Sequence, residues 1–198
     1  MSDLAQRLSQ IEASLKRLGR DVLVSALQPG LPGEAVRSAL GSVGLAGNSE
    51  LEQLYGWHDG TSTVGITAAG DIHLFPGFYL LSIGDAIANH RAFVTDPRWQ
   101  PGWLPIFANG GGDFYVADLM PAAGGPVRHF RIEEVDHPIE FPSLAAMMLA
   151  LAQAFEREIF FVHQNGYLDM DDLVFGSLAA ELNPDVAWWV HQYSRRTS

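Results

Sequence analysis

Five short apolar segments follow one another through the middle of the chain, and they constrain the fold more than any other sequence feature. The segments cover residues 71–75, 78–81, 103–108, 114–119 and 127–132. Turn-forming residues separate them, including Pro76-Gly77 and three glycines at 110–112. One helix is predicted between them, near 83–91. Because consecutive strands joined by turns pair with one another, we predict an antiparallel or mixed sheet and the α+β class.

Helical patterns lie on both sides of these segments. Apolar residues near the N-terminus recur every three or four positions, which predicts a helix that docks on the domain: Leu4, Leu8, Ile11, Leu15 and Leu18. Ser49 to Glu52 matches a capping box, which opens a helix that Asp59-Gly60 closes. Ser143 is predicted to cap a helix that runs to about Arg157. Shorter helices are expected near 21–27, 34–40, 170–182 and over a last segment with Val186, Trp189, Val190 and Tyr193.

The composition excludes several classes of protein. A chain of 198 residues with 47% hydrophobic and 11% aromatic residues is not intrinsically disordered. The net charge of −11 disfavours a nucleic-acid binder, because contact with phosphates requires a basic face. The chain has no cysteine, which removes disulfides and thiolate metal sites. The longest apolar run, 141–155, is too short for a membrane span of about 20 residues, and no secretory signal is visible, so a cytoplasmic location without membrane contact is predicted.

The negative charge is concentrated in the C-terminal third. Residues 1–132 carry a net charge of −3, whereas residues 133–185 hold 11 acids and one base, Arg157. An acidic surface steers basic partners toward it. The candidate partner-binding residues are therefore the acids Glu133, Glu134, Asp136, Asp169, Asp171 and Asp172, with Trp188, Trp189 and Tyr167 as aromatic anchors if exposed.

Motifs of catalysis and cofactor binding are weak. The glycines at 110–112 lack the Lys-Ser/Thr of a phosphate-binding loop, so an inter-strand turn is the better interpretation. The seven histidines show no metal-binding spacing, and the acids at 169–172 lack the glycine and closing Glu of a calcium loop. Residues 60–64 lack the last glycine of a nucleophile elbow. We assign no catalytic, cofactor or metal residue, and we expect a protein that is not an enzyme.

One ordered set of residues resembles a known family. It begins with a helix ending Tyr55-x-Trp57-His58-Asp59-Gly60, continues through Pro76-Gly77 and includes the block Trp103-Leu104-Pro105-Ile106-Phe107-Ala108-Asn109-Gly110-Gly111-Gly112-Asp113 with a second acid, Asp118. A turn and strand at Gly125-Pro126-Val127 and a helix opened by Pro142-Ser143 follow. In this order, over about residues 30–155, the chain resembles the SUKH superfamily, in particular its Smi/Knr-type branch.

This resemblance implies an α+β fold with N-terminal helices packed on a mainly antiparallel sheet, and it implies no catalytic residues. Bacterial members are commonly immunity proteins that bind and neutralise a cognate polymorphic toxin, often a nuclease. The branch is named for a yeast regulator of cell-wall assembly. The chain then divides into an N-terminal helical extension (1–29), a core (30–158) and an acidic C-terminal helical extension (159–198) packed on that core in one globular unit.

Three hypotheses follow for the function. The first is a cytoplasmic immunity protein, a monomer or weak homodimer, that occludes a basic toxin domain by direct contact. The second is a regulator or scaffold of cell-wall or envelope metabolism. The third is a small hydrolase in which two of Asp59, Asp113 and Asp118 converge. The motif residues otherwise have structural roles, with Trp57 and Trp103 in the core and the acids at turns.

Overall fold

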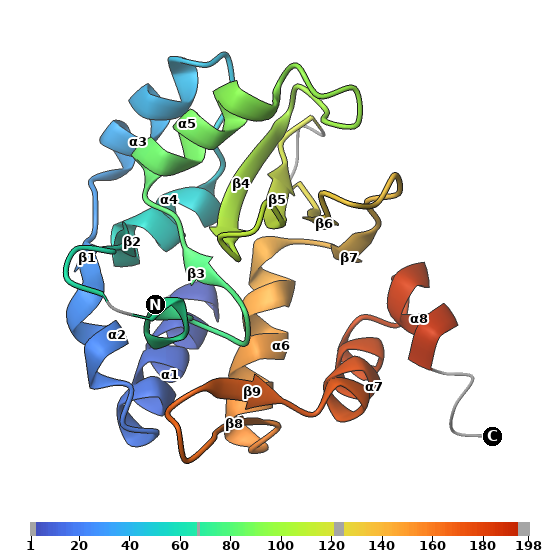
Figure 1. Cartoon of the computed structure of the whole chain (residues 1–198). Helices are drawn as coiled ribbons and strands as arrows, with labels where there is room; N and C mark the ends of the chain where they lie inside the picture. Colours follow the sequence, from blue (N-terminus) through green and yellow to red (C-terminus); the bar gives the residue numbers. More distant parts are fainter. Residues whose placement is uncertain (1–2, 67, 121–124, 194–198) are drawn as a thin grey trace.

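A five-stranded antiparallel sheet forms the centre of the computed structural model, which describes residues 3–66, 68–120 and 125–193 (Figure 1). The strands lie side by side in chain order, and every neighbouring pair is antiparallel. They are β3 (Tyr79–Leu80), β4 (Trp103–Ala108), β5 (Phe114–Asp118), β6 (Val127–Phe130) and β7 (Ile139–Phe141). The predicted α+β class with an antiparallel sheet is confirmed.

The two central strands are buried on both faces. All residues of β4 and β5 are buried, and successive side chains of a strand point to opposite faces. Phe114 contacts the ring of Phe93 from helix α5 (Ile83–Phe93), whereas its neighbour Tyr115 contacts Phe75 and Phe78. The sheet therefore has an aromatic core on each side.

Two of the N-terminal helices, α1 (Asp3–Arg17) and α4 (Ser49–Trp57), pack beside α6 (Leu144–Glu156), the helix that follows the sheet (Figure 1). Helix α1 contacts α6 and α4, and its predicted apolar stripe is buried from Leu4 to Leu15. The other helices of this part are α2 (Asp21–Ala26) and α3 (Gly33–Gly41). The short strands β1 (Leu27–Pro29) and β2 (His58–Thr61) pair between them; both contain turn-forming residues, so the sequence did not predict them.

The capping residue of α4 differs from the prediction. Asn48 has extended backbone angles, and its Oδ1 accepts a hydrogen bond of 2.9 Å from the amide of Leu51. Ser49 is already the first helical residue, and the Glu52 carboxylate pairs with Arg37 at 2.6 Å. The capping box was wrong by one residue, because the Asx side chain reaches the third helical amide and Ser49 is left within the helix.

Removing the true cap is expected to destabilise the protein more than removing the neighbouring hydroxyl. Asn48→Ala should lower the free energy of unfolding by about 1 kcal/mol, since it leaves an amide of the first turn unsatisfied. Ser49→Ala should change it by less than about 0.5 kcal/mol. Urea unfolding of both variants measures the difference. A larger loss of stability for Ser49→Ala would mean that Ser49, and not Asn48, caps the helix.

Residues 71–75 do not form the predicted strand. Residues Ala69–Ile72 make a 3-10 turn, η1, and Phe75 forms a single bridge with Phe78. The backbone carbonyls of Gly70 and His73 accept hydrogen bonds from the Arg20 guanidinium, at 2.5 and 3.4 Å, instead of pairing with a strand. The apolar pattern therefore marked a buried segment and not a strand. Within it, the distant Arg20 holds the His73 carbonyl, and the amides of Leu74 and Phe75 donate to the Phe78 carbonyl in a local turn.

The C-terminal block packs on α6 and β7. It consists of the hairpin β8 (Phe160–Val162) and β9 (Leu168–Met170), then α7 (Asp172–Leu182) and α8 (Ala187–Tyr193). Helix α7 contacts α6, and α8 contacts β7. Rings join the parts in a continuous series through Phe155, Phe160, Phe175, Trp189 and Phe141. The strands β7 and β9 were not predicted, because β7 is short and lies between two prolines and β9 follows a turn directly.

No helix within residues 3–66, 68–120 and 125–193 combines the length and apolar character needed to cross a bilayer.

Candidate functional site

The glycine-rich segment after β4 is a tight turn, as predicted. Asn109 organises it, because its Oδ1 accepts hydrogen bonds from the amides of Gly111 at 2.7 Å and Asp113 at 3.1 Å. Gly110 and Gly112 have φ values of +79° and +106°, which side chains rarely adopt. The turn connects β4 to β5.

The hydrolase hypothesis requires two of Asp59, Asp113 and Asp118 to converge, but each of these acids contacts a different segment of the chain. Asp59 accepts a hydrogen bond from the Ile83 amide at the start of α5, at 2.8 Å. Asp113 accepts one from the Ile132 amide at 2.9 Å, and Asp118 pairs with Arg128 at 2.9 Å. Each of the three carboxylates is thus engaged by a different segment of the chain, as expected for acids at turns and strand ends.

The remaining motif residues support the fold. Tyr55 is fully buried and Trp103 is 5% exposed, and burial raises the pKa of the Tyr55 hydroxyl. Trp57 is half-buried, and its indole N–H donates to Glu12 of α1 at 3.0 Å. Pro76-Gly77 turns the chain between Phe75 and Phe78, and the β4–β5 register shifts next to Pro105. Trp57 therefore attaches α4 to α1 more than it fills the core.

The candidate acids lie in two separate segments. Glu133, Glu134 and Asp136 are exposed in the loop between β6 and β7. Arg98 braces this loop, since its guanidinium donates to the carbonyls of Ile132 and Glu134. Hydrogen bonds from Arg98 in turn lower the pKa of the Asp96 carboxyl to about 2. The loop therefore presents its three acids on a backbone held by another part of the chain.

The other three acids adjoin the start of α7. Asp171 is its N-cap and accepts hydrogen bonds from the amides of Leu173 and Val174. Asp169 pairs with His163 at 2.9 Å, and this hydrogen bond lowers the pKa of its carboxyl. Asp172 occupies the first turn and is exposed. Helix capping therefore accounts for Asp171.

Trp189 is not the exposed anchor that the sequence left open. It is 5% exposed, packs against Phe141 and Phe175, and its indole N–H donates to the Glu140 carbonyl. Trp188 is half-buried, with the Arg131 guanidinium 5.0 Å from its ring centre. Tyr167, 42% exposed, is the most accessible of the three aromatic candidates. Packing of α8 on β7 turned Trp189 inward.

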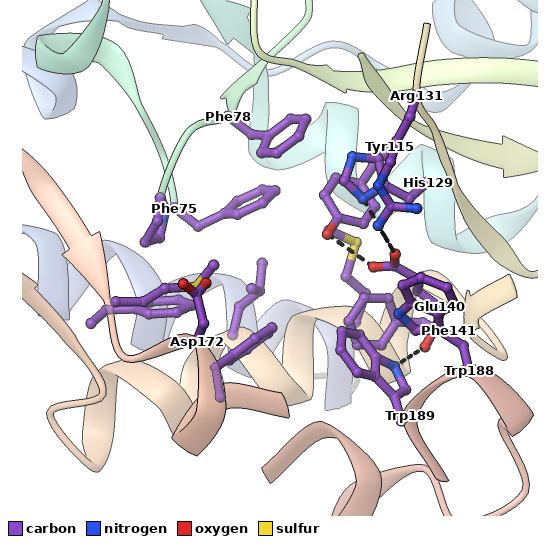
Figure 2. A pocket seen from close by; sticks show the side chains of 16 residues that line it. Phe75, Phe78, Tyr115, His129, Arg131, Glu140, Phe141, Asp172, Trp188 and Trp189 are labelled. Carbon is purple, nitrogen blue, oxygen red and sulfur yellow. Dashed lines mark hydrogen bonds and ion pairs between the residues drawn. The ribbon is translucent and has the colours of Figure 1, made fainter. Parts of the chain in front are cut away.

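A cavity of about 190 Å³ lies where the central sheet, α6 and the C-terminal block meet (Figure 2). Rings from the segment before β3, from the sheet and from the C-terminal block line it, and α6 adds Met147 and Leu151. The rings belong to Phe75, Phe78, Tyr115, Phe141, Phe160, Phe175, Trp188 and Trp189. Four charged or titratable side chains also line it: His129, Arg131, Glu140 and Asp172. The sequence did not predict this site, because its walls come from segments far apart along the chain.

A buried carboxylate organises one end of the cavity. Glu140 is 1% exposed and accepts hydrogen bonds from Arg131 at 2.7 Å and from the Tyr115 hydroxyl at 3.0 Å. His129 Nδ1 lies 3.3 Å from the same carboxylate. Tyr115 and His129 are directly opposed in the β5–β6 register, and their rings stack. The signal in the sequence was a lone acid between Ile139 and Phe141, but its partners depend on strand pairing.

No cluster of three or more His, Asp or Glu side chains suited to a metal ion occurs in residues 3–66, 68–120 and 125–193. Comparison with protein-family models finds no match to the chain, and a search of curated proteins finds none either.

Two buried histidines predict a loss of stability in mild acid. Burial lowers the pKa of both His73 and His137, and Arg20 lowers that of His73 further. Neither ring nitrogen of His73 has a hydrogen-bond partner among the described residues. In the unfolded chain a histidine titrates near pH about 6.5. The unfolded state therefore takes up protons first as the pH falls, which favours unfolding.

The free energy of unfolding should accordingly be constant above pH about 7 and decrease as the pH falls from about 6.5 toward the lowered pKa values. Urea unfolding at a series of pH values measures this slope. His73→Gln should reduce the slope, and His191→Gln, at an exposed position of α8, is the matched control. An unchanged slope in His73→Gln would contradict the assignment.

Proposed function

We propose that the chain is a non-catalytic protein-binding module, a bacterial immunity protein that neutralises a cognate toxin by direct contact in the cytoplasm. The resemblance to Smi/Knr-type proteins suggests this class, and the observation that carries the proposal is the distribution of acids. Of the eleven acidic residues in 133–185, Glu140 alone is buried. The other ten are at least partly accessible, so the charge that this third of the chain adds to the surface is mainly negative.

The partner suited to such a surface is a basic toxin domain, for example a nuclease. A nuclease is positively charged where it binds phosphates, so an acidic inhibitor gains electrostatic attraction and covers the substrate site. The loop with Glu133, Glu134 and Asp136 is the preferred contact. Arg98 already holds the backbone of this loop. The loop therefore loses less conformational entropy when the toxin binds.

Co-expression with the immediate upstream gene tests this proposal. We expect that gene to be toxic alone and harmless together with this chain, and we expect the two purified proteins to form a complex that weakens as salt rises. A harmless neighbour that forms no complex would contradict immunity and leave the regulator of envelope metabolism as the better hypothesis. A complex whose affinity does not change with salt would contradict the proposal that charge attraction drives binding.

A triple substitution locates the contact. Glu133→Gln, Glu134→Gln and Asp136→Asn together should weaken toxin binding about tenfold, since each exposed charge contributes up to about 1 kcal/mol. The control removes three exposed acids from the N-terminal helices, as Asp3→Asn, Asp21→Asn and Glu34→Gln. Titration calorimetry at fixed salt compares them. Equal weakening by both triple variants would mean that net charge, and not this loop, determines binding.

A further inference from the structure

The cavity between the sheet, α6 and α7 is large enough for one aromatic ring with a short substituent. Its volume is about 190 Å³, and an apolar cavity of about 150 Å³ is known to hold benzene. Phe75 and Phe78 lie on one side of this space, and Trp189 lies on the other (Figure 2). These rings bound the space with apolar and π-electron-rich surface.

The charges around the cavity do not balance. Arg131 is 2.7 Å from Glu140 and compensates it, and His129 and Tyr115 contact the same carboxylate. Asp172, across the cavity from this cluster (Figure 2), forms no hydrogen bond or ion pair with another described residue. Because Asp172 is exposed, it also marks a side from which solvent and small molecules reach the lining. One carboxylate is therefore left without a counter-charge.

Aromatic walls and an uncompensated carboxylate suit one class of ligand. Ring faces attract cations, and a carboxylate supplies the opposite full charge. An anion would meet two carboxylates, Glu140 and Asp172. Arg131 is the only guanidinium that lines the cavity; it pairs with Glu140 through Nη2, and its Nη1 has no hydrogen-bond partner among the described residues. We propose that this cavity binds a small organic cation, a protonated amine or quaternary ammonium group on an apolar body, with Asp172 as its counter-charge. This site is independent of the protein-binding function proposed above.

Three probes of similar size and different charge test the site: benzylamine, which is cationic at pH 7, neutral benzyl alcohol and anionic benzoate. Titration calorimetry of the whole chain at low salt should show benzylamine binding about fivefold or more tightly than benzyl alcohol. Benzoate should bind more weakly than either. Chemical shift changes in the Trp188 and Trp189 indole signals should accompany binding and locate it.

Asp172→Asn should bring benzylamine to within about twofold of benzyl alcohol and leave the affinity for the alcohol unchanged. Asp185→Asn, which removes an exposed acid of the same block outside the lining, is the control and should keep the preference. Circular dichroism and thermal unfolding establish that both variants are folded. Equal binding of the three probes, or a preference that survives Asp172→Asn, would overturn the cation site. Absence of binding by all three would overturn the cavity as a ligand site.

Discussion

Glu140→Leu is expected to lower the free energy of unfolding by about 3–5 kcal/mol, the usual cost of breaking a buried ion pair from one side. Glu140 is 1% exposed and accepts hydrogen bonds from Arg131 and Tyr115, with His129 beside it. Leucine replaces the carboxylate by an apolar group of similar size. The Arg131 guanidinium then keeps its charge in a largely buried site without its partner. Urea or thermal unfolding measures the loss.

A double variant separates the ion pair from simple packing. Adding Arg131→Met to Glu140→Leu removes the orphaned charge, and buried ion pairs replaced by apolar residues often regain stability. We expect the double variant to recover at least about half of the loss. If it is less stable than Glu140→Leu alone, the Arg131–Glu140 pair does not carry the effect.

The exposed pair of Arg157 and Glu181 provides the control. Its two charged groups are 3.4 Å apart, and both side chains are largely in solvent. Glu181→Gln should change the free energy of unfolding by less than about 1 kcal/mol, because exposed pairs are screened by water. A similar loss at positions 140 and 181 would contradict the burial of Glu140.

Gly60→Ala is expected to cost about 3–4 kcal/mol. Gly60 has a φ of +82°, which costs an L-residue about 1–2 kcal/mol. An added Cβ would also lie 2.2 Å from the amide nitrogen of Ser82 and 2.8 Å from the carbonyl carbon of Leu81. Both are backbone atoms at the start of α5, so they cannot rotate away. Overpacking of this kind adds about 1–3 kcal/mol.

Gly77 provides a matched comparison. It has the same φ of +82°, but an added Cβ would meet no atom within 4 Å. Gly77→Ala should therefore cost only the conformational part, about 1–2 kcal/mol. Denaturant unfolding measures the free energy of unfolding of both variants, and the difference between their losses is the cost of the steric clash at Gly60. Equal losses would mean that backbone conformation alone explains both glycines.

The segments predicted best from the sequence were those whose conformation depends on near neighbours. The strand at Trp103–Ala108 was predicted with its observed bounds, because Gly102 precedes this apolar run and Asn109-Gly110 follows it. The helix after Ser143 was also predicted with its cap: the Ser143 hydroxyl accepts the Ala146 amide at 3.1 Å. In both cases the hydrogen bond at the boundary of the element joins residues at most four positions apart: Asn109 with Asp113 after the strand, and Ser143 with Ala146 at the start of the helix.

Predictions failed where a distant residue decided the outcome. Residues 71–75 have the composition of a strand, but Arg20 binds the carbonyl of His73 and that of Gly70 just before the segment. Tryptophan is a residue type that often anchors protein interfaces, but Trp189 packs on Phe141 and is buried. Of the candidate site, the acids at 133–136 were named from the sequence and are exposed. The aromatic cavity was missed, because no local pattern connects Phe75 with Trp189.

The sequence by itself determined the α+β class, a sheet of consecutive strands joined by turns, the glycine turn after β4 and the concentration of acids from residue 133 onward. These properties depend on composition and on short-range periodicity, which the chain carries wherever it folds. Only the tertiary structure decided which of those acids is buried and which groups surround it. Glu140 of β7 meets Tyr115 of β5 and His129 of β6 because these strands are neighbours in the sheet, and Arg131 directly follows β6. A buried charge requires such partners, and strand pairing alone brings them together.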